Sequence, residues 1–169
     1  MTKLSDGPQQ LLSALDPILA RVAALDLPSK TAASEIQDVE AALEREFPYA
    51  GEQIQAIGAL IARGVDEGWL ADRGEPDSRF SRVAKPTEQT HDLSVDIVSM
   101  VGSGLEHTHL AGEVTIGFPA GDPAKSCQFE GRGPGWVVLG PDSRHIPTVE
   151  GERMNLIYFL PGGAVKWHR

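Results

Sequence analysis

The sequence predicts an α+β fold in which N-terminal helices are followed by an antiparallel β-structure. Apolar residues recur at intervals of three and four up to about residue 67, which is the period of an amphipathic helix. From Phe80 onward apolar and polar residues alternate instead, and turns rich in glycine and proline separate the alternating runs. We therefore expect a helical region at residues 1–70, acting in packing, as a lid or in dimerisation, and a β-domain at residues 71–169 that carries the functional site.

The N-terminal region has the pattern of three helices. The first is predicted at residues 8–26, where Pro17 is expected to kink the helix or split it. The second, at residues 31–46, ends before a proline, and the third, at residues 50–67, ends at Gly68. Their apolar stripes carry no catalytic chemistry, so we expect these helices to pack on one another, on the β-domain or against a second subunit.

The second half of the chain is predicted to form strands. Residues 122–135 are a long connection rich in glycine and proline, and loops of that length in a small domain are often functional or mobile. Cys127 lies in this connection. As the single cysteine it excludes an internal disulfide, and we interpret it as a bystander thiol. The predicted strands include residues 80–84, 93–100, 107–109, 113–118, 136–139, 154–160 and 164–168.

One stretch carries the most specific chemical signal, because its residues have the spacing of metal ligands. Alternate side chains of a β-strand share a face, so His107 and His109 point toward one position. The short segment ending in Gly112 suits a tight reversal, which delivers Glu113 beside the two histidines on a returning strand. A second turn, rich in glycine and proline, precedes a fourth candidate ligand, His145. The four residues predict a metal site.

Three imidazoles and one carboxylate suit a divalent cation. With neutral imidazoles the bound ion would retain a net charge of about +1, and an octahedral ion would keep positions for water or substrate. Such a site can attract an anion and carry out chemistry. These ligand types bind iron, manganese, nickel, cobalt and zinc, so the ligands leave the identity of the metal open.

Residues 104–119 resemble the first motif of the cupin superfamily, in which a glycine, HxH, a glutamate and a closing glycine follow in order. Residues 139–147 resemble the second motif, with His145 as ligand, although Val149 stands where that motif has an asparagine. The resemblance covers about residues 80 to 169. It implies a small antiparallel β-barrel of the jelly-roll type with the metal near one mouth. The first motif corresponds here to Gly102 or Gly104, His107, His109, Glu113 and Gly117.

A closer resemblance links residues 107–119, 133–149 and 158–168 to the small cupin-like 4-hydroxylaminobenzoate lyases of bacterial nitroaromatic degradation. Those enzymes convert 4-hydroxylaminobenzoate to 3,4-dihydroxybenzoate (protocatechuate) and release ammonia. The resemblance implies that the metal polarises the N–O bond of the substrate and that water then attacks an electron-poor ring.

The implied reaction also needs groups that transfer protons. Glu113, Tyr158 and Glu106 are the candidate catalytic residues. Glu106, however, precedes His107 by one position, so its strand parity favours a side chain that faces solvent.

Recognition of the substrate calls for a cation and an aromatic surface. An arginine would pair with the substrate carboxylate, and Arg144, Arg132 and Arg153 lie close to the site segments in the sequence. Trp136 and Tyr158 are candidates for stacking on the aromatic ring, although both also suit a β-core.

The composition argues against several classes of partner. The formal net charge is −9 and the isoelectric point is near 4.9, which disfavours binding to a nucleic-acid backbone or an anionic membrane. Residues 57–86 have the outline of a winged-helix end, but helix 50–67 contains Arg63 as its only basic residue, which suits DNA poorly. The first residues lack a signal-peptide core and no apolar run approaches a membrane span, so we expect a cytoplasmic protein.

Two rival functions are also compatible with the sequence. The same ligand set in other cupins supports oxygen activation by ferrous iron, so a metal-dependent dioxygenase acting on a small aromatic or thiol is the enzymatic alternative. The non-enzymatic alternative is a small-ligand sensor in which the helices report binding. A homodimer is compatible with either function, because amphipathic helices and small barrels often form subunit interfaces.

Overall fold

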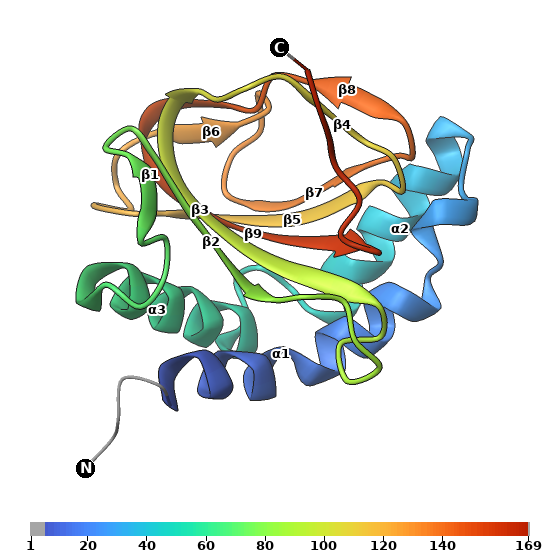
Figure 1. Cartoon of the computed structure of the whole chain (residues 1–169), viewed down its shortest axis with the longest axis horizontal. Coiled ribbons are helices and arrows are strands. Elements are labelled where there is room, and N and C mark those ends of the chain that lie inside the picture. Colours follow the sequence, from blue (N-terminus) through green and yellow to red (C-terminus); the bar gives the residue numbers. More distant parts are fainter. Residues whose placement is uncertain (1–5, 169) are drawn as a thin grey trace.

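The computed structural model describes residues 6–168 and confirms the predicted order of helices followed by antiparallel strands (Figure 1). In this part of the chain the α-helices are α1 (Asp6–Ala24), α2 (Ala33–Glu46) and α3 (Glu52–Glu67), with a short 3-10 helix η1 (Leu27–Ser29) after α1. Each predicted helix is confirmed, with ends shifted by about two residues, as expected for helix termini. Pro17 lies inside a continuous α1, so it does not split the helix.

The strands occupy the rest of the chain. They are β1 (Arg73–Glu75), β2 (Ser78–Ala84), β3 (Leu93–Ser103), β4 (His107–His109), β5 (Glu113–Pro119), β6 (Cys127–Phe129), β7 (Gly135–Leu139), β8 (Ser143–His145), β9 (Thr148–Pro161) and β10 (Lys166–Trp167). The segment predicted as a connection at residues 122–135 contains β6, whose three residues pair with β9. The sequence did not predict β6, because its pairing partner lies about twenty residues away.

The strands form two antiparallel sheets that face each other. The large sheet has the order β1-β2-β3-β9-β5-β7, with β6 also paired to β9, and the small sheet has the order β10-β4-β8. Figure 1 shows β4 and β8 above the large sheet and the helices below it. The predicted jelly-roll class is confirmed, with the strands arranged as a sandwich of two sheets and not as one closed barrel.

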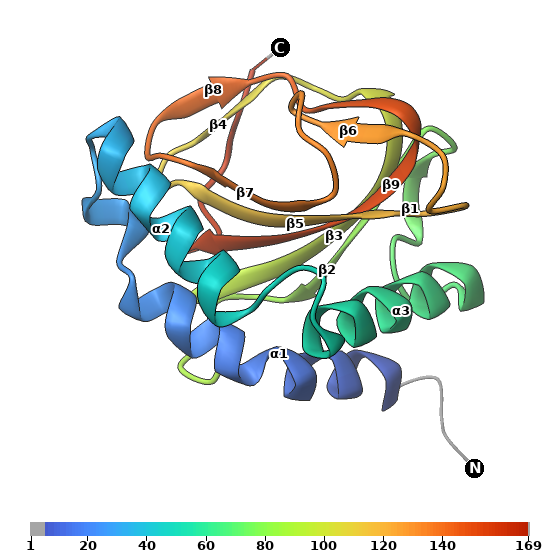
Figure 2. The same ribbon diagram turned by 180° about the vertical axis from the view of Figure 1, so that it is seen from behind.

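The helices cover the outer face of the large sheet, as the reverse view shows most clearly (Figure 2). Alternation along β9 divides its side chains between two cores. Ile157 and Phe159 join the buried side chains of the helices, whereas Leu156, Tyr158 and Leu160 face the space between the sheets. A side chain of the large sheet can therefore reach the space between the sheets only if its position along the strand directs it to that face.

The segment with the winged-helix outline is part of this architecture. Strand β2 pairs with β3 along the large sheet, and β1 pairs with β2 at the edge of that sheet. The apolar stripe of α3, which includes Ile54, Ile57 and Ile61, is buried in the helix-facing core. None of the helices described is long and apolar enough to cross a lipid bilayer.

Candidate metal centre

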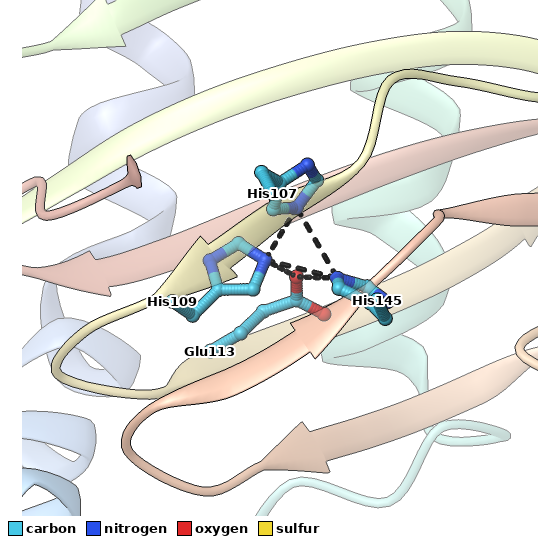
Figure 3. A group of neighbouring side chains, drawn as sticks. All are labelled: His107, His109, Glu113 and His145. Carbon is cyan, nitrogen blue, oxygen red and sulfur yellow. Dashed lines mark hydrogen bonds and ion pairs between the residues drawn. The ribbon is translucent and has the colours of Figure 1, made fainter. Parts of the chain in front are cut away.

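Four side chains from the two sheets converge on one point between them (Figure 3). Strands β4 and β8 of the small sheet supply the imidazoles, because His107 lies directly opposite His145 in the strand register and His109 follows on the same face. Strand β5 of the large sheet supplies Glu113 at its first residue. One potential ligand atom from each of the four residues lies within 4.8 Å of the others.

The distances within the cluster are those of ligands gathered around a shared centre. The Nε2 atom of His109 lies 2.7 Å from Nε2 of His107 and 3.1 Å from Nε2 of His145, and the third pair is separated by 3.2 Å. Oε1 of Glu113 lies 2.6 Å from Nε2 of His109 and 3.7 Å from Nε2 of His145. His107, His109 and Glu113 are buried, while the side chain of His145 retains 11% exposure.

The protonation of His107 suits a cation. The Nδ1 atom of His107 lies 3.0 Å from the carbonyl oxygen of Leu105, and a proton donated there leaves the lone pair on Nε2, facing the cluster. Burial, followed by the nearby His109, lowers the pKa of His107 to about 4, so this imidazole is neutral at physiological pH. Both oxygens of Glu113 are buried and have no conventional hydrogen-bond donor within residues 6–168, although Oε1 lies 2.6 Å from Nε2 of His109. A divalent ion would satisfy these atoms together.

The reversal that joins His109 to Glu113 connects the two sheets. Glu113 was expected on a returning strand after a tight reversal, and that strand is β5, which belongs to a different sheet from β4. The chain crosses between the sheets at residues 110–112, where Gly112 has a φ of +94°. As predicted, this crossing brings the carboxylate to the histidines.

Glu130, which the sequence did not indicate, contacts the outer side of the cluster. Its Oε1 lies 3.2 Å from Nδ1 of His145, on the opposite side of the ring from the converging Nε2, and accepts a hydrogen bond from the backbone N–H of Thr148. Burial tends to lower the pKa of His145, but Glu130 and Glu113 outweigh it and raise the pKa. Glu130 thus contacts His145 on its outer side. The second cupin motif has an asparagine four residues after this histidine, and this chain has Val149 at that position.

Replacing Glu130 with glutamine is expected to weaken the binding of a divalent ion by about tenfold. A carboxylate that contacts the ring nitrogen facing away from the metal orients a ligand histidine and raises its basicity. Glutamine keeps the size of the side chain and an oxygen for the Thr148 N–H, so the fold should be retained. Glu152→Gln is the matched control, because Glu152 is exposed and pairs only loosely with Lys125 at 3.9 Å. Competition with a chromophoric chelator measures both affinities, and equal values for the two variants would contradict the assigned role.

Tyr158 faces the cluster side of the large sheet. It lies opposite Thr115 in the β5–β9 register, and Thr115 is two residues from Glu113 on the same face. Burial first, and then the negative charges of Glu113 and Glu130, raise the pKa of Tyr158 well above its ordinary value. The phenol is therefore protonated at physiological pH and able to donate a hydrogen bond. The buried hydroxyl of Thr115, a further residue that the sequence did not indicate, has no hydrogen-bond partner among the residues described.

Glu106 lies outside the cluster, on the outer side of the small sheet, in agreement with its strand parity. A guanidinium nitrogen of Arg144 donates a hydrogen bond of 2.7 Å to its carboxylate. That bond lowers the pKa of Glu106 and keeps the carboxylate ionised. Arg144 itself is paired with Thr108 in the register, on the face opposite the ligand histidines. The structure therefore does not bring Glu106 or Arg144 to the cluster.

The structure places the remaining predicted substrate-binding residues away from the cluster as well. Trp136 faces the helices, where its indole N–H donates to the carbonyl oxygen of Phe47. Both terminal nitrogens of Arg132 contact the carboxylate of Glu40 on α2. Arg153 donates to the carbonyl oxygen and hydroxyl of Ser99. Residue type and sequence proximity suggested these side chains, but the parity of the strands and the packing of α2 direct them away from the cluster.

Cys127 is a buried side chain of β6 between the sheets. Burial raises the pKa of its thiol, which keeps it in the unreactive protonated form. This environment is that of a packing residue.

The chain matches the family described as PnbB, 4-hydroxylaminobenzoate lyase, over residues 27–167. The 4-hydroxylaminobenzoate lyase of Nocardioides sp. (strain LMS-CY) is 29% identical over 167 residues, covering 95% of this chain and 94% of the relative. That of Pseudomonas putida is 29% identical over 145 residues, covering 77% of this chain and 82% of the relative. Among solved structures, an RmlC-like cupin protein from Ralstonia eutropha is 11% identical with a TM-score of 0.42, covering 56% of this chain and 62% of that one.

Proposed function

The chain belongs to the 4-hydroxylaminobenzoate lyase family, and we propose that it converts 4-hydroxylaminobenzoate and water to 3,4-dihydroxybenzoate and ammonia. The observation that carries this proposal is the convergence of three histidines and one glutamate between the sheets. All four residues fall within the segment that matches the family. The two relatives named as lyases of this substrate match most of the chain, which supports the same activity here.

The proposed reaction needs no external oxidant. The hydroxylamino nitrogen gains an electron pair when its N–O bond breaks, and the ring loses an electron pair as oxygen from water becomes bonded to it. Water adds to the ring beside the nitrogen-bearing carbon, a second water replaces the nitrogen, and the hydroxylamino oxygen leaves as water. The net change is therefore the uptake of one water and the release of one ammonia.

His107, His109, Glu113 and His145 would hold the divalent ion that this chemistry uses. When bound, such an ion acts as a Lewis acid that polarises an N–O bond and increases the acidity of a water molecule. The side chains define the electrostatics around it: three neutral imidazoles and one carboxylate leave a net charge of about +1, which favours an anionic substrate.

Tyr158 is the best placed of the predicted proton-transfer residues. Its phenol is protonated, lies on the cluster side of the large sheet and is close enough to Glu113 for that charge to affect its pKa. We assign to it donation of a hydrogen bond or proton to the oxygen or nitrogen that leaves the substrate. Glu113 is assigned primarily as a ligand, because its carboxylate is buried among the histidine nitrogens.

The proposal is tested by incubating the metal-loaded protein with 4-hydroxylaminobenzoate under anaerobic and aerobic conditions. We expect ammonia and 3,4-dihydroxybenzoate in equal amounts at the same rate in both, measured by an ammonia assay and by chromatography. Turnover that consumes oxygen would identify a dioxygenase instead. Tight binding of the metal and of a small aromatic, with no turnover of the hydroxylamine, would favour a sensor.

A further inference from the structure

An exposed tryptophan lies beside the metal centre. Trp167 is 60% exposed, yet its ring centroid lies only 5.0 Å from that of His107, with the rings inclined at 69°. Among residues 6–168, most of the exposed large apolar side chains flank the small sheet. Apart from Trp167 these are Leu105, Leu110 and Ile146, and the exception is Phe80 on β2.

The strand register holds the indole on the inner face of the small sheet. Trp167 is directly opposite His107 in the antiparallel β10–β4 pair, and directly opposed residues project to the same face. The next residue fixes this position, because Nε2 of His168 lies 2.7 Å from the hydroxyl of Thr108 and the backbone N–H of His168 donates to the carbonyl oxygen of Glu106. Figure 1 shows this C-terminal segment running from the end of β9 up to the small sheet.

Trp167 combines two properties that the other aromatic side chains near the cluster lack. It touches a candidate metal ligand and also retains a large exposed surface. Tyr158 and Phe129 are buried against each other, with ring centroids 6.2 Å apart. Trp136 is on the opposite face of the large sheet. An indole is also the largest aromatic surface that a protein can offer to a planar ligand.

We propose that Trp167 is the aromatic surface on which the ring of the substrate stacks while its nitrogen substituent lies at the metal centre. This inference rests on the proposed function, which supplies an aromatic substrate. It assigns recognition of the ring to the C-terminal strand and makes Trp167 a determinant of specificity for aromatic over aliphatic hydroxylamines.

The proposal is tested with Trp167→Leu, Trp167→Phe and the control Phe80→Leu, which removes an exposed aromatic from β2. Titration of intrinsic fluorescence with 4-hydroxybenzoate, an unreactive aromatic, should quench the wild type and Phe80→Leu, and this response should be absent from Trp167→Leu. The Kd of that variant, measured by calorimetry, should rise about tenfold, and Trp167→Phe should recover most of the affinity. In turnover, KM for 4-hydroxylaminobenzoate should rise by a similar factor with kcat changed less than about threefold.

The outcomes separate this inference from the proposed function. If the wild type releases no ammonia but Trp167→Leu still loses affinity for 4-hydroxybenzoate, the lyase assignment fails and the aromatic surface stands. If the wild type is active and Trp167→Leu keeps both its KM and its Kd, the inference is overturned. It is also overturned if Trp167→Leu converts a dimer to monomers in sedimentation experiments while ligand affinity is unchanged, because Trp167 would then be a subunit contact.

Discussion

A variant carrying both His107→Ala and His145→Ala is expected to bind no divalent ion and to release ammonia more than about 1,000-fold more slowly than the wild type. Loss of a single residue that supports a metal ligand commonly lowers metal affinity or activity by about 10- to 100-fold. This change removes two of the four candidate ligands themselves, one from each of two paired strands of the small sheet. The remaining pair, His109 and Glu113, belongs to different sheets and cannot complete the coordination alone.

Metal content by elemental mass spectrometry and ammonia release are measured on the same samples of this variant. His91→Asn is the control, because His91 is exposed and lies outside the cluster. Asparagine also tolerates the left-handed backbone at that position, where φ is +56°. Circular dichroism establishes that both variants are folded. Ammonia release at the wild-type rate by the folded double variant would exclude the cluster as the site of the reaction.

Gly112→Ala is expected to lower the free energy of unfolding by about 2–5 kcal/mol. Its φ of +94° lies in the left-handed region, which costs an alanine about 1–2 kcal/mol. An added Cβ would also lie 2.6 Å from the buried side chain of Leu27 and 3.1 Å from the carbonyl oxygen of Leu139, and such crowding costs about 1–3 kcal/mol more. Because this residue lies in the crossing between His109 and Glu113, metal affinity should fall as well.

Gly102→Ala separates the two contributions to that loss. Gly102 has a similar φ of +80°, but an added Cβ meets no atom within 4 Å. Its free energy of unfolding should therefore fall by only about 1–2 kcal/mol, with metal affinity unchanged. Chemical denaturation measures both variants. Equal losses of stability would show that the contact with Leu27 relaxes without cost, and unchanged metal affinity in Gly112→Ala would show that the crossing does not position Glu113.

The convergence of the four candidate ligands was predictable, because local geometry determines where three of them lie. Strand parity alone directs His107 and His109 to one side, and a short reversal limits how far Glu113 can lie from them. His145 follows a turn and was expected from its spacing. The helices were predictable for a similar reason, since the period of their apolar residues requires no knowledge of the partner they pack against.

The environment of the cluster was not predictable, because it depends on contacts between segments far apart in the chain. Whether Trp136 faces the cluster or the helices depends on which face of the large sheet α2 and α3 cover, and either face suits an indole. Glu130 reaches His145 only because β6 pairs with β9. Trp167 reaches His107 only because β10 joins the small sheet and not the large one. Alternation within one strand carries no information about such pairings.

The most direct test of a metal-assisted lyase is a titration of divalent metal into protein stripped by a chelator, performed without oxygen. The bound metal per chain and the rate of ammonia release from 4-hydroxylaminobenzoate are measured at each step. We predict that the stripped protein is inactive and that the rate rises in proportion to bound metal, reaching its maximum at about one ion per chain. Release of ammonia by the stripped protein at the full rate would contradict the account, because the histidines and glutamate would then act without a metal.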